Sequence, residues 1–418
     1  MYGPEALLVH LKERGLPMPP AIERAFLSVD IAAMLPEPLR PLAYANAPIP
    51  YSVRFRGTIL PSPPILAALL QLLEPAPGLD IGVVGAMAGY PAALAAHVMK
   101  RGSVVIVEPD EELREQASRN LEEAPLDDRI SVVSAFKDHK FDRILLLDST
   151  RKPTEFMKFL GDPGFVVSRG LAAEGMAFRK RIRSGSAELE LDVADMPVGP
   201  RGGSEAHAMT WARLLARDEL VERAWEARVL GPQDTHFADA IEETFRGGPL
   251  DSKREALDVR AIAARRSFHV AYIVQHLGEL RDAADLYERS LALFPTAEGH
   301  TFLGWAHSFM GDADRAIAEC KRAIEVDPTF GNPYNDIGAY LIELGRHDEA
   351  IEWLKKALVS ERYCCYFFAH TNLGRAYMMK GLQQLARKHF EEALKVNPGY
   401  EPAQEMLRRL GHGIDYVA

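Results

Sequence analysis

The last third of the chain repeats itself at a period of about 34 residues, and this feature constrains the fold most. Gly304, Gly338 and Gly374 recur at separations of 34 and 36 residues. Two further series of small residues recur in step: Ala283, Ala316, Ala350 and Ala386, and Ser290, Ala323, Ala357 and Ala393. A fixed period of this length predicts a stack of helix pairs, in which small residues allow neighbouring helices to approach closely. This part is therefore expected to be all-α.

Two of the units resemble the tetratricopeptide repeat. They read "PYNDIGAYLIELGRHDEAIEWLKKAL" and "HTNLGRAYMMKGLQQLARKHFEEALKVNP". Pro295, Pro328 and Pro398 end three units, and Arg362 holds that place in the other. The resemblance implies about four units over residues 263–411, the last closed by a helix at Pro402–Leu410, and a tail over 412–418.

A tetratricopeptide stack implies a groove lined by the first helix of each pair, which binds a protein or peptide. The candidates for this groove, by repeat position, are Phe302, Trp305, Phe309, Asn335, Asp336, Phe368, Asn372 and Arg375. Asn335, Asn372 and Arg375 would hold an extended peptide backbone or a carboxylate. For each candidate, repeat packing or solvent exposure is the competing interpretation. The adjacent Cys364 and Cys365 are expected to be packing residues.

A second informative stretch, Val83 to Glu108, has the pattern of a βαβ unit with a glycine turn. An apolar run leads to Gly85 and Gly89, an Ala/Leu-rich helix follows, and a second apolar run ends at Glu108. The glycines would let the backbone approach a nucleotide, and Glu108 would accept hydrogen bonds from a ribose. Two plainer interpretations stay open. The glycines would serve only strand-to-helix packing, or Glu108 would be a solvated acid before the helix Asp110–Asn120.

Strands alternate with helices around this unit. They are expected near Ile81–Val84, Val104–Val107, Ser131–Val133, Arg143–Leu147 and Phe165–Val167, with helices within residues 5–45 and at Ile65–Leu73. This alternation predicts a doubly wound parallel sheet, with ligands at the carboxyl ends of its strands. Phe178–Leu191 alternates polar and apolar residues, as a final antiparallel pair would.

The first 200 residues also carry a resemblance. The ordered segments "AFLSVD", "AYANAPIP", "GTILPSPPILAALLQLL", "GVVGAMAGYPAALAAHVM" and "VVIVEPDEELREQASRNL" resemble protein-L-isoaspartate O-methyltransferase. That family uses S-adenosylmethionine to methylate a peptide carboxylate, on a doubly wound methyltransferase sheet. The resemblance implies that Gly85, Ala86, Gly89, Tyr90 and Glu108 bind the cofactor.

The chain departs from the family pattern at several places in one pocket. Val83 stands for an acid, Met87 for the middle loop glycine, and Asn46 for an aspartate. Ile59-Leu60-Pro61 aligns with the family's Thr-Ile-Ser, whose serine belongs to the substrate site. Ser134-Ala135-Phe136 aligns roughly with Gly-Asp-Gly, which reaches the adenine end of the cofactor. Proline at 61 offers neither a hydroxyl nor an N–H, alanine at 135 accepts no hydrogen bond, and Met87 adds bulk where a cofactor needs close approach.

Two functions follow from these observations. The first is a scaffold or adaptor that binds a protein or peptide through its repeats and carries a non-catalytic, pseudoenzyme-like domain. The second is an S-adenosylmethionine-dependent protein carboxyl methyltransferase whose repeats recruit a polypeptide, although no catalytic base is evident. The enzyme requires an open cleft beside Gly85 and Glu108, whereas the scaffold predicts that Met87, Phe136 or a neighbour fills it.

Composition argues against several kinds of partner and cofactor. A net charge of −10 argues against a general nucleic-acid partner. The three cysteines form no Cys-x-x-Cys pair, so no metal is expected. No signal segment or long apolar run is evident, so we expect no membrane span and a cytoplasmic location.

Break signals suggest a division into domains. Gly199-Pro200-Arg201-Gly202-Gly203 separates an α/β domain over 1–199 from a helical connector over 200–262. The connector is expected to contain helices up to Glu226, at His236–Phe245 and at Asp251–Arg266, and the repeats follow it.

Overall fold

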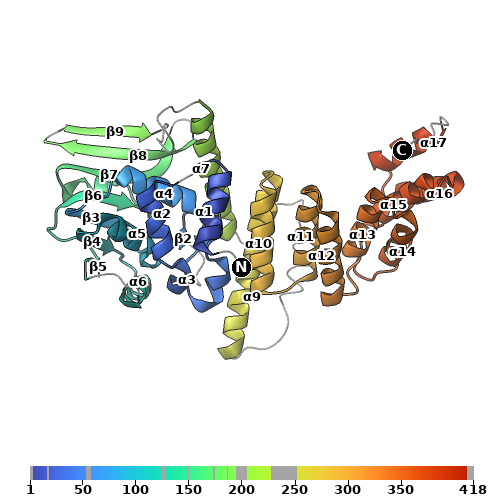
Figure 1. Ribbon diagram of the computed structural model, residues 1–418, viewed down its shortest axis with the longest axis horizontal. Helices are drawn as coiled ribbons and strands as arrows, with labels where there is room; N and C mark the ends of the chain where they lie inside the picture. The colour runs from blue at the N-terminus through green and yellow to red at the C-terminus, as the bar shows by residue number, and fades with distance from the viewer. Residues whose placement is uncertain are drawn as a thin grey trace. The chain divides into compact units, whose positions relative to one another are not determined.

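The computed structural model describes residues 3–16, 18–52, 58–123, 128–148, 150–172, 175–185, 187–193, 205–226 and 252–411. The chain divides into two compact units, Met1–Leu230 and Gly231–Ala418 (Figure 1). The first contains a mixed sheet covered by helices, and the second is a series of helix pairs. The predicted fold class, a doubly wound methyltransferase-like sheet followed by a helical solenoid, is confirmed.

The first unit begins with four short helices, three of which have a proline in the first turn. These are α1 (Pro4–Glu13), α2 (Pro20–Ser28), α3 (Ile31–Met34) and the 3-10 helix η1 (Glu37–Leu42). A two-stranded antiparallel sheet follows, in which β1 (Ile49–Pro50) pairs with β2 (Ile59–Leu60). Next comes α4 (Pro63–Leu73), whose first turn tolerates two prolines because its N–H groups need no helical partner.

The main sheet has seven strands in the order β5-β4-β3-β6-β7-β8-β9. The strands are β3 (Leu79–Val84), β4 (Gly102–Val107), β5 (Ile130–Val133), β6 (Phe141–Leu146), β7 (Leu160–Ala172), β8 (Gly175–Ser184) and β9 (Ala187–Val193). The first five are parallel, and β8 and β9 continue the sheet as an antiparallel hairpin (Figure 1). All five predicted parallel strands and the final antiparallel pair are confirmed.

The central strand β3 explains where a ligand site would lie. From β3 the chain moves outward to β4 and β5 and then returns to pair β6 with the other side of β3. The strand order therefore reverses beside β3, and open α/β sheets bind ligands at such a point, beyond the carboxyl ends of the strands. The helices α5 (Tyr90–Met99) and α6 (Glu111–Glu123) follow β3 and β4. Val83 is fully buried in β3, so this position serves the core.

One helix belongs to a different unit from the one that the sequence predicted. Helix α7 (Glu205–Glu226), expected in a connector, is part of the first unit and packs against β8. The connector helix expected at His236–Phe245 lies outside the described residues. The one expected at Asp251–Arg266 is the first part of a longer helix, α9 (Ser252–His276).

The second unit continues from α9 as antiparallel helix pairs. They are α10 (Leu280–Leu293), α11 (Ala297–Phe309), α12 (Ala313–Val326), α13 (Asn332–Glu343), α14 (His347–Leu358), α15 (Tyr366–Met379), α16 (Gln383–Val396) and the closing α17 (Glu401–Gly411). The repeating glycines mark close crossings inside the pairs. A Cβ at Gly338 would lie 2.4 Å from Leu354 Cγ, and one at Gly374 would lie 2.5 Å from Phe390 Cε1. In the described part of the chain, no helix combines the length and apolarity needed to cross a bilayer.

Candidate functional sites

The loop after β3 has an unusual backbone. Gly85 and Gly89 have φ values of +95° and +86°, which glycine adopts without strain. Met87 and Ala88 also have positive φ values, 43° and 59°. A non-glycine residue in this region costs on the order of 1 kcal/mol or more, and such strain is kept only when the surroundings impose it. Met87 is buried, and it forms with Ala88 and Gly89 the 3-10 turn η2 (Met87–Gly89).

Glu108, the predicted ribose acceptor, bonds to the protein's own backbone. Its side chain is buried. Glu108 Oε2 accepts a hydrogen bond from the Ala86 N–H at 3.0 Å, and Oε1 accepts one from the Asp110 N–H at 3.0 Å. A carboxylate offers about four lone-pair positions, so these two bonds leave it some acceptor capacity. Glu108 thus connects the glycine loop to the start of α6 and is not a solvated acid.

Helix α6 also holds the loop after β3, through a hydrogen bond and a close packing contact. Asn120 Nδ2 donates to Ala88 O at 2.9 Å and to Met34 O at 2.7 Å. A Cβ on Gly89 would lie 3.0 Å from Leu121 Cγ, so Gly89 is required for helix packing as well as for the turn.

Tyr51, which the sequence did not single out, lies over this loop. Its side chain is 3% exposed. Burial raises the pKa of Tyr51 well above its ordinary value, and the nearby carboxylates of Glu108 and Asp148 raise it further. The phenol is therefore near Met87 in the loop and near Glu108 and Asp148, which follow β4 and β6. No local pattern marks a tyrosine 57 residues before Glu108 as a neighbour of that acid.

These observations test whether S-adenosylmethionine fits. The residues that would hold it are Gly85, Ala86, Gly89, Tyr90 and Glu108. Tyr51 and Met87 are both buried, and Tyr51 lies near Met87 and Glu108. The Ala86 N–H is already donated to Glu108. Two buried side chains therefore lie beside this loop, while Glu108 keeps acceptor positions that a ribose could use.

Phe136 does not fill this place. It is buried among Phe141, Phe156 and Phe159, with ring centroids 4.5, 6.3 and 5.5 Å away. A Cβ at Gly82, in the middle of β3, would lie 2.9 Å from Phe136 Cζ. Phe136 therefore packs on the face of the sheet, and of the two residues suggested for filling the cleft, Met87 is the one in the loop.

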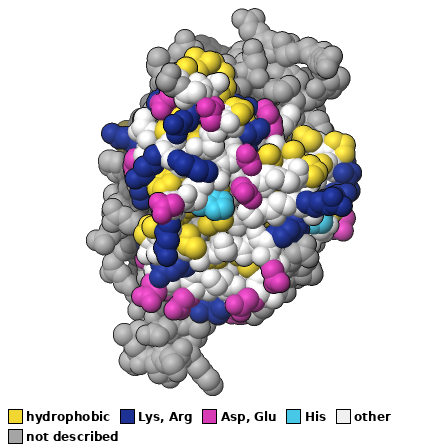
Figure 2. All heavy atoms as spheres, turned by 90° about the vertical axis from the view of Figure 1, so that its left-hand side faces the viewer, with side chains coloured by type: hydrophobic (Ala, Val, Ile, Leu, Met, Phe, Trp, Pro, Cys, Tyr) yellow, Lys and Arg dark blue, Asp and Glu magenta, His cyan; other side chains and the backbone are white. Residues whose placement is uncertain are grey.

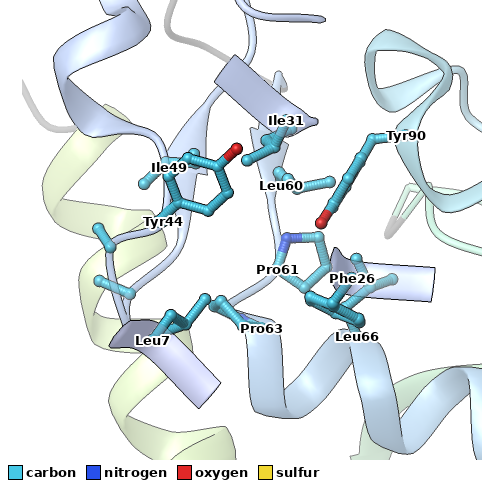
Figure 3. Close-up of a pocket in the computed structure, with 12 residues that line it drawn as sticks. Leu7, Phe26, Ile31, Tyr44, Ile49, Leu60, Pro61, Pro63, Leu66 and Tyr90 are labelled. Atoms are coloured by element: carbon cyan, nitrogen blue, oxygen red, sulfur yellow. The ribbon is translucent and has the colours of Figure 1, made fainter. Parts of the chain in front are cut away.

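The segment aligned with the family's substrate site lines part of a small apolar pocket (Figure 3). Its volume is about 20 Å³, which is room for a single water molecule. Pro61, Ile49 and Leu60 line it, and Figure 3 shows the Tyr90 hydroxyl pointing toward the Pro61 ring. The Tyr44 hydroxyl, on another side, bonds to Asp30. Aliphatic groups and proline rings make up most of this lining, so it offers a peptide carboxylate few donors.

Helix α7 covers the neighbouring polar groups of the same segment. Ser62 donates from its N–H and its Oγ to Asp218 Oδ2, at 3.1 and 2.6 Å. Asp218 is fully buried, and its other oxygen lies 3.3 Å from Arg217 Nη2. Trp225 Nε1 donates to Pro48 O at 2.9 Å. The hydroxyl beside Pro61 is thus held by a carboxylate of the chain itself. Sequence reasoning missed this contact because 156 residues separate its partners.

In the second unit, five predicted groove residues form one chain of hydrogen bonds across α11, α13 and α15. Arg375 Nη1 donates to Asn372 Oδ1 at 3.1 Å, and Asn372 Nδ2 donates to Asn335 Oδ1 at 3.0 Å. Asn335 Nδ2 donates to Asp336 Oδ1 at 3.1 Å, and Trp305 Nε1 donates to Asp336 Oδ2 at 2.6 Å. We call this set the polar chain. Burial raises the pKa of Asp336 to about 7, although both hydrogen bonds lower it.

The exposure of the predicted groove residues differs widely. Phe309 is 65% exposed and Phe368 is 39% exposed, while Trp305, Asn372 and Arg375 are partly exposed. Asn335 and Asp336 are buried. Phe302 is a core residue, 5% exposed and in contact with the rings of Phe268 and Trp305. The packing alternative is therefore correct for Phe302, and the exposed phenylalanines are the better candidates for a ligand.

No group of three or more metal-ligating side chains occurs among the residues that the structure describes. On the face drawn in Figure 2, basic and acidic side chains are interspersed without a large area of one sign.

A doubly wound sheet with a glycine loop and an acid after the second strand defines a methyltransferase-like domain, and the helix pairs define a tetratricopeptide stack. Residues 3–140 match the family model "Protein-L-isoaspartate(D-aspartate) O-methyltransferase". Residues 297–330, 319–352 and 367–400 each match a tetratricopeptide repeat model. Both predicted resemblances are confirmed.

Individual relatives agree with this division. The protein-L-isoaspartate O-methyltransferase of Methanopyrus kandleri is 35% identical over 130 residues, which cover 31% of this chain and 56% of that protein. The one from Pyrobaculum islandicum is 29% identical, over 38% of this chain and 80% of that protein. With most of these relatives the match spans about half their length.

Among solved structures, the crystal structure of MamA is 22% identical and covers 41% of this chain and 96% of its own, with a TM-score of 0.30. PilW, a type IV pilus biogenesis factor, is 21% identical and covers 36% of this chain and 69% of its own, with a TM-score of 0.34. Likenesses of this size carry no argument about function.

Proposed function

We propose that this protein is a scaffold that binds a protein or peptide through its tetratricopeptide repeats, and that its methyltransferase-like domain is non-catalytic. The observation that carries the proposal is the state of the glycine loop. Tyr51 lies near this loop and Met87 is buried within it. Glu108 accepts a hydrogen bond from the loop's Ala86 N–H. Catalysis would require the methyl donor and the acceptor to meet in an accessible cleft. None of these three features favours an accessible cleft beside the loop.

The binding part of the proposal rests on the α11–α13–α15 face, the surface that carries the polar chain with Phe309 and Phe368. Exposed aromatic side chains are common anchors at protein interfaces because they bury a large area at low entropic cost. The asparagines and Arg375 beside them offer donors and acceptors to a peptide backbone. Arg375 is partly exposed and also carries a positive charge that suits a carboxylate.

A peptide display library selected on the full chain tests this surface. We expect selected peptides to lose at least about tenfold in affinity for the double variant Phe309→Ala/Phe368→Ala, since each removes an exposed anchor worth about 1 kcal/mol or more. The variants Asn372→Ala and Arg375→Ala should each weaken binding. The matched control is Glu108→Ala, which should bind the same peptides with unchanged affinity. Peptides that bind the double variant as well as the wild type would refute the assignment of this face.

The second candidate is an S-adenosylmethionine-dependent carboxyl methyltransferase whose repeats recruit a polypeptide. Gly85, Gly89 and Glu108 favour it, because they retain the turn geometry and the acid that a nucleotide site uses. It would require Tyr51 to leave the loop and Asp218 to release Ser62. In that case Glu108→Ala should abolish methyl transfer, whereas the scaffold has no activity to lose.

A further inference from the structure

A pair of adjacent thiols lies at the start of α15. Cys364 and Cys365 are consecutive, yet both side chains turn to the same side, and their sulfur atoms are 3.4 Å apart. Cys364 is exposed and Cys365 is partly exposed, whereas the third cysteine, Cys320, is buried. The sequence suggested that the pair packs inside the stack, and the exposure of Cys364 contradicts this.

The chain on both sides of the pair is fixed. On one side, the Gly331 N–H donates to Arg362 O at 3.0 Å, and the Arg362 N–H donates to Thr329 O at 2.9 Å. The Arg362 side chain also bonds to Glu298 at 2.7 Å. On the other side, the Phe368 N–H donates to Cys365 O at 2.9 Å in the first turn of α15. The two thiols are therefore held together by anchored backbone and do not meet by chance in a loose loop.

We propose that Cys364 and Cys365 form a redox-active vicinal dithiol, which small-molecule disulfides convert reversibly into an intramolecular disulfide. This assignment goes beyond the proposed scaffold function and does not depend on it.

The order of attack follows from exposure. Burial and the hydrogen bond with Cys364 raise the pKa of Cys365, so Cys365 keeps its proton. The exposed Cys364 is the thiol that meets a reagent first. As a thiolate it attacks one sulfur of a disulfide RSSR, forms a mixed disulfide and releases RS⁻, which takes up a proton. Cys365 then loses its proton and attacks the Cys364 sulfur, and the second RSH leaves. The protein loses two hydrogens and two electrons, and the small disulfide is reduced to two thiols.

The product should be easily reduced. Consecutive Cα atoms are about 3.8 Å apart across a trans peptide, whereas disulfides usually need about 4.4–6.8 Å. The ring is therefore strained, and strained disulfides have more oxidising potentials and are the labile ones. Reversibility is thus a consequence of the two cysteines being adjacent.

The experiment treats the reduced full-length protein with oxidised glutathione and follows it by intact mass and peptide mapping. We expect the wild type to lose two hydrogens without a lasting adduct, and to recover its mass in excess reduced glutathione. Cys365→Ser should stop at a glutathione adduct on Cys364, because the resolving thiol is absent. Cys364→Ser should react about tenfold more slowly or worse, because the remaining thiol is less exposed and keeps its proton. Cys320 should stay unmodified throughout, which reports that the fold is intact.

Three results would overturn the proposal. A wild type that ends as the same stable adduct as Cys365→Ser has no resolving step. A Cys364→Ser variant that reacts as fast as the wild type excludes Cys364 as the attacking thiol. A native protein that does not react, while the urea-unfolded protein does, excludes an accessible dithiol.

Discussion

Met87 has a backbone conformation that glycine would adopt without strain. Its φ of 43° lies in the left-handed region, and its side chain is buried beside Gly89. The side chain and the backbone therefore act in opposite directions on stability. The buried methionine stabilises the fold through its contacts, while its backbone conformation costs on the order of 1 kcal/mol.

A pair of variants separates these effects. Met87→Ala and Met87→Gly both remove the side chain, but only glycine relaxes the backbone. We expect the glycine variant to be more stable than the alanine variant by about 1 kcal/mol, in contrast to most positions outside glycine turns. Urea unfolding monitored by circular dichroism measures the difference. An alanine variant as stable as the glycine variant would show that this loop is not strained.

Asp336 makes the stability of the helical unit depend on pH. Burial raises the pKa of Asp336 to about 7 in the folded chain, against about 3.9 in an unfolded one. The folded state therefore binds the proton more tightly, and the stability from this residue is complete below about pH 4 and is lost as the pH rises to about 7. His269 and His389 act oppositely, because burial lowers the pKa of each to about 4.

The variant Asp336→Asn isolates this contribution, since both histidines remain. We expect the free energy of unfolding of the wild type to fall relative to the asparagine variant between pH 5 and pH 7.5, by about 2 kcal/mol or more. Urea titrations of both proteins across this range provide the measurement. A difference between them that stays constant with pH would mean that Asp336 is ionised throughout.

At the scale of elements, α7 differs most from its predicted role, because it was expected in a connector and packs in the first unit. Asp218 accepts two hydrogen bonds from Ser62 at the beginning of α4, where the helix dipole also favours a negative charge. Its second oxygen faces the buried Arg217. These contacts attach α7 to the segment that the family uses for its substrate.

Asp218→Ala should detach this helix. The change removes a carboxylate from a buried arginine and from two donors, which typically costs about 3–5 kcal/mol. Ser62→Ala is the milder matched variant and should cost about 1–2 kcal/mol. Hydrogen exchange measured by mass spectrometry on peptides from α7 and α4 would register faster exchange in Asp218→Ala. Equal exchange in the two variants would mean that the carboxylate does not hold α7.

The sequence predicted the elements well and their contacts poorly, for a physical reason. The strands around β3 are short apolar runs between glycines, and the repeats recur at a fixed period, so both signals are local. The proximity of Tyr51 to Glu108 and the hydrogen bonds of Ser62 with Asp218 involve distant residues that no periodicity connects. The polar chain shows a third case. The sequence predicts each of its residues as a separate ligand contact. In the structure they bond to one another, because the first helices of successive pairs lie side by side.

At the scale of the whole molecule, the chain joins two units with separate cores and different chemistry. The α/β unit has a methyltransferase-like fold, and its own carboxylates Glu108 and Asp218 accept hydrogen bonds from the glycine loop and from Ser62. The helical unit exposes aromatic side chains beside a row of hydrogen-bonding groups. We propose that only the second unit binds a ligand as part of the function.

Calorimetric titration of the folded full-length protein with S-adenosylmethionine, and then with S-adenosylhomocysteine, tests this claim most directly. Met87→Gly serves as the comparison, since it removes the buried side chain from the loop and relaxes the backbone. We predict no binding heat for the wild type at millimolar ligand. Saturable binding at micromolar concentration would contradict the scaffold, because Tyr51 and Met87 would then have to yield to the cofactor, and the methyltransferase would become the better account.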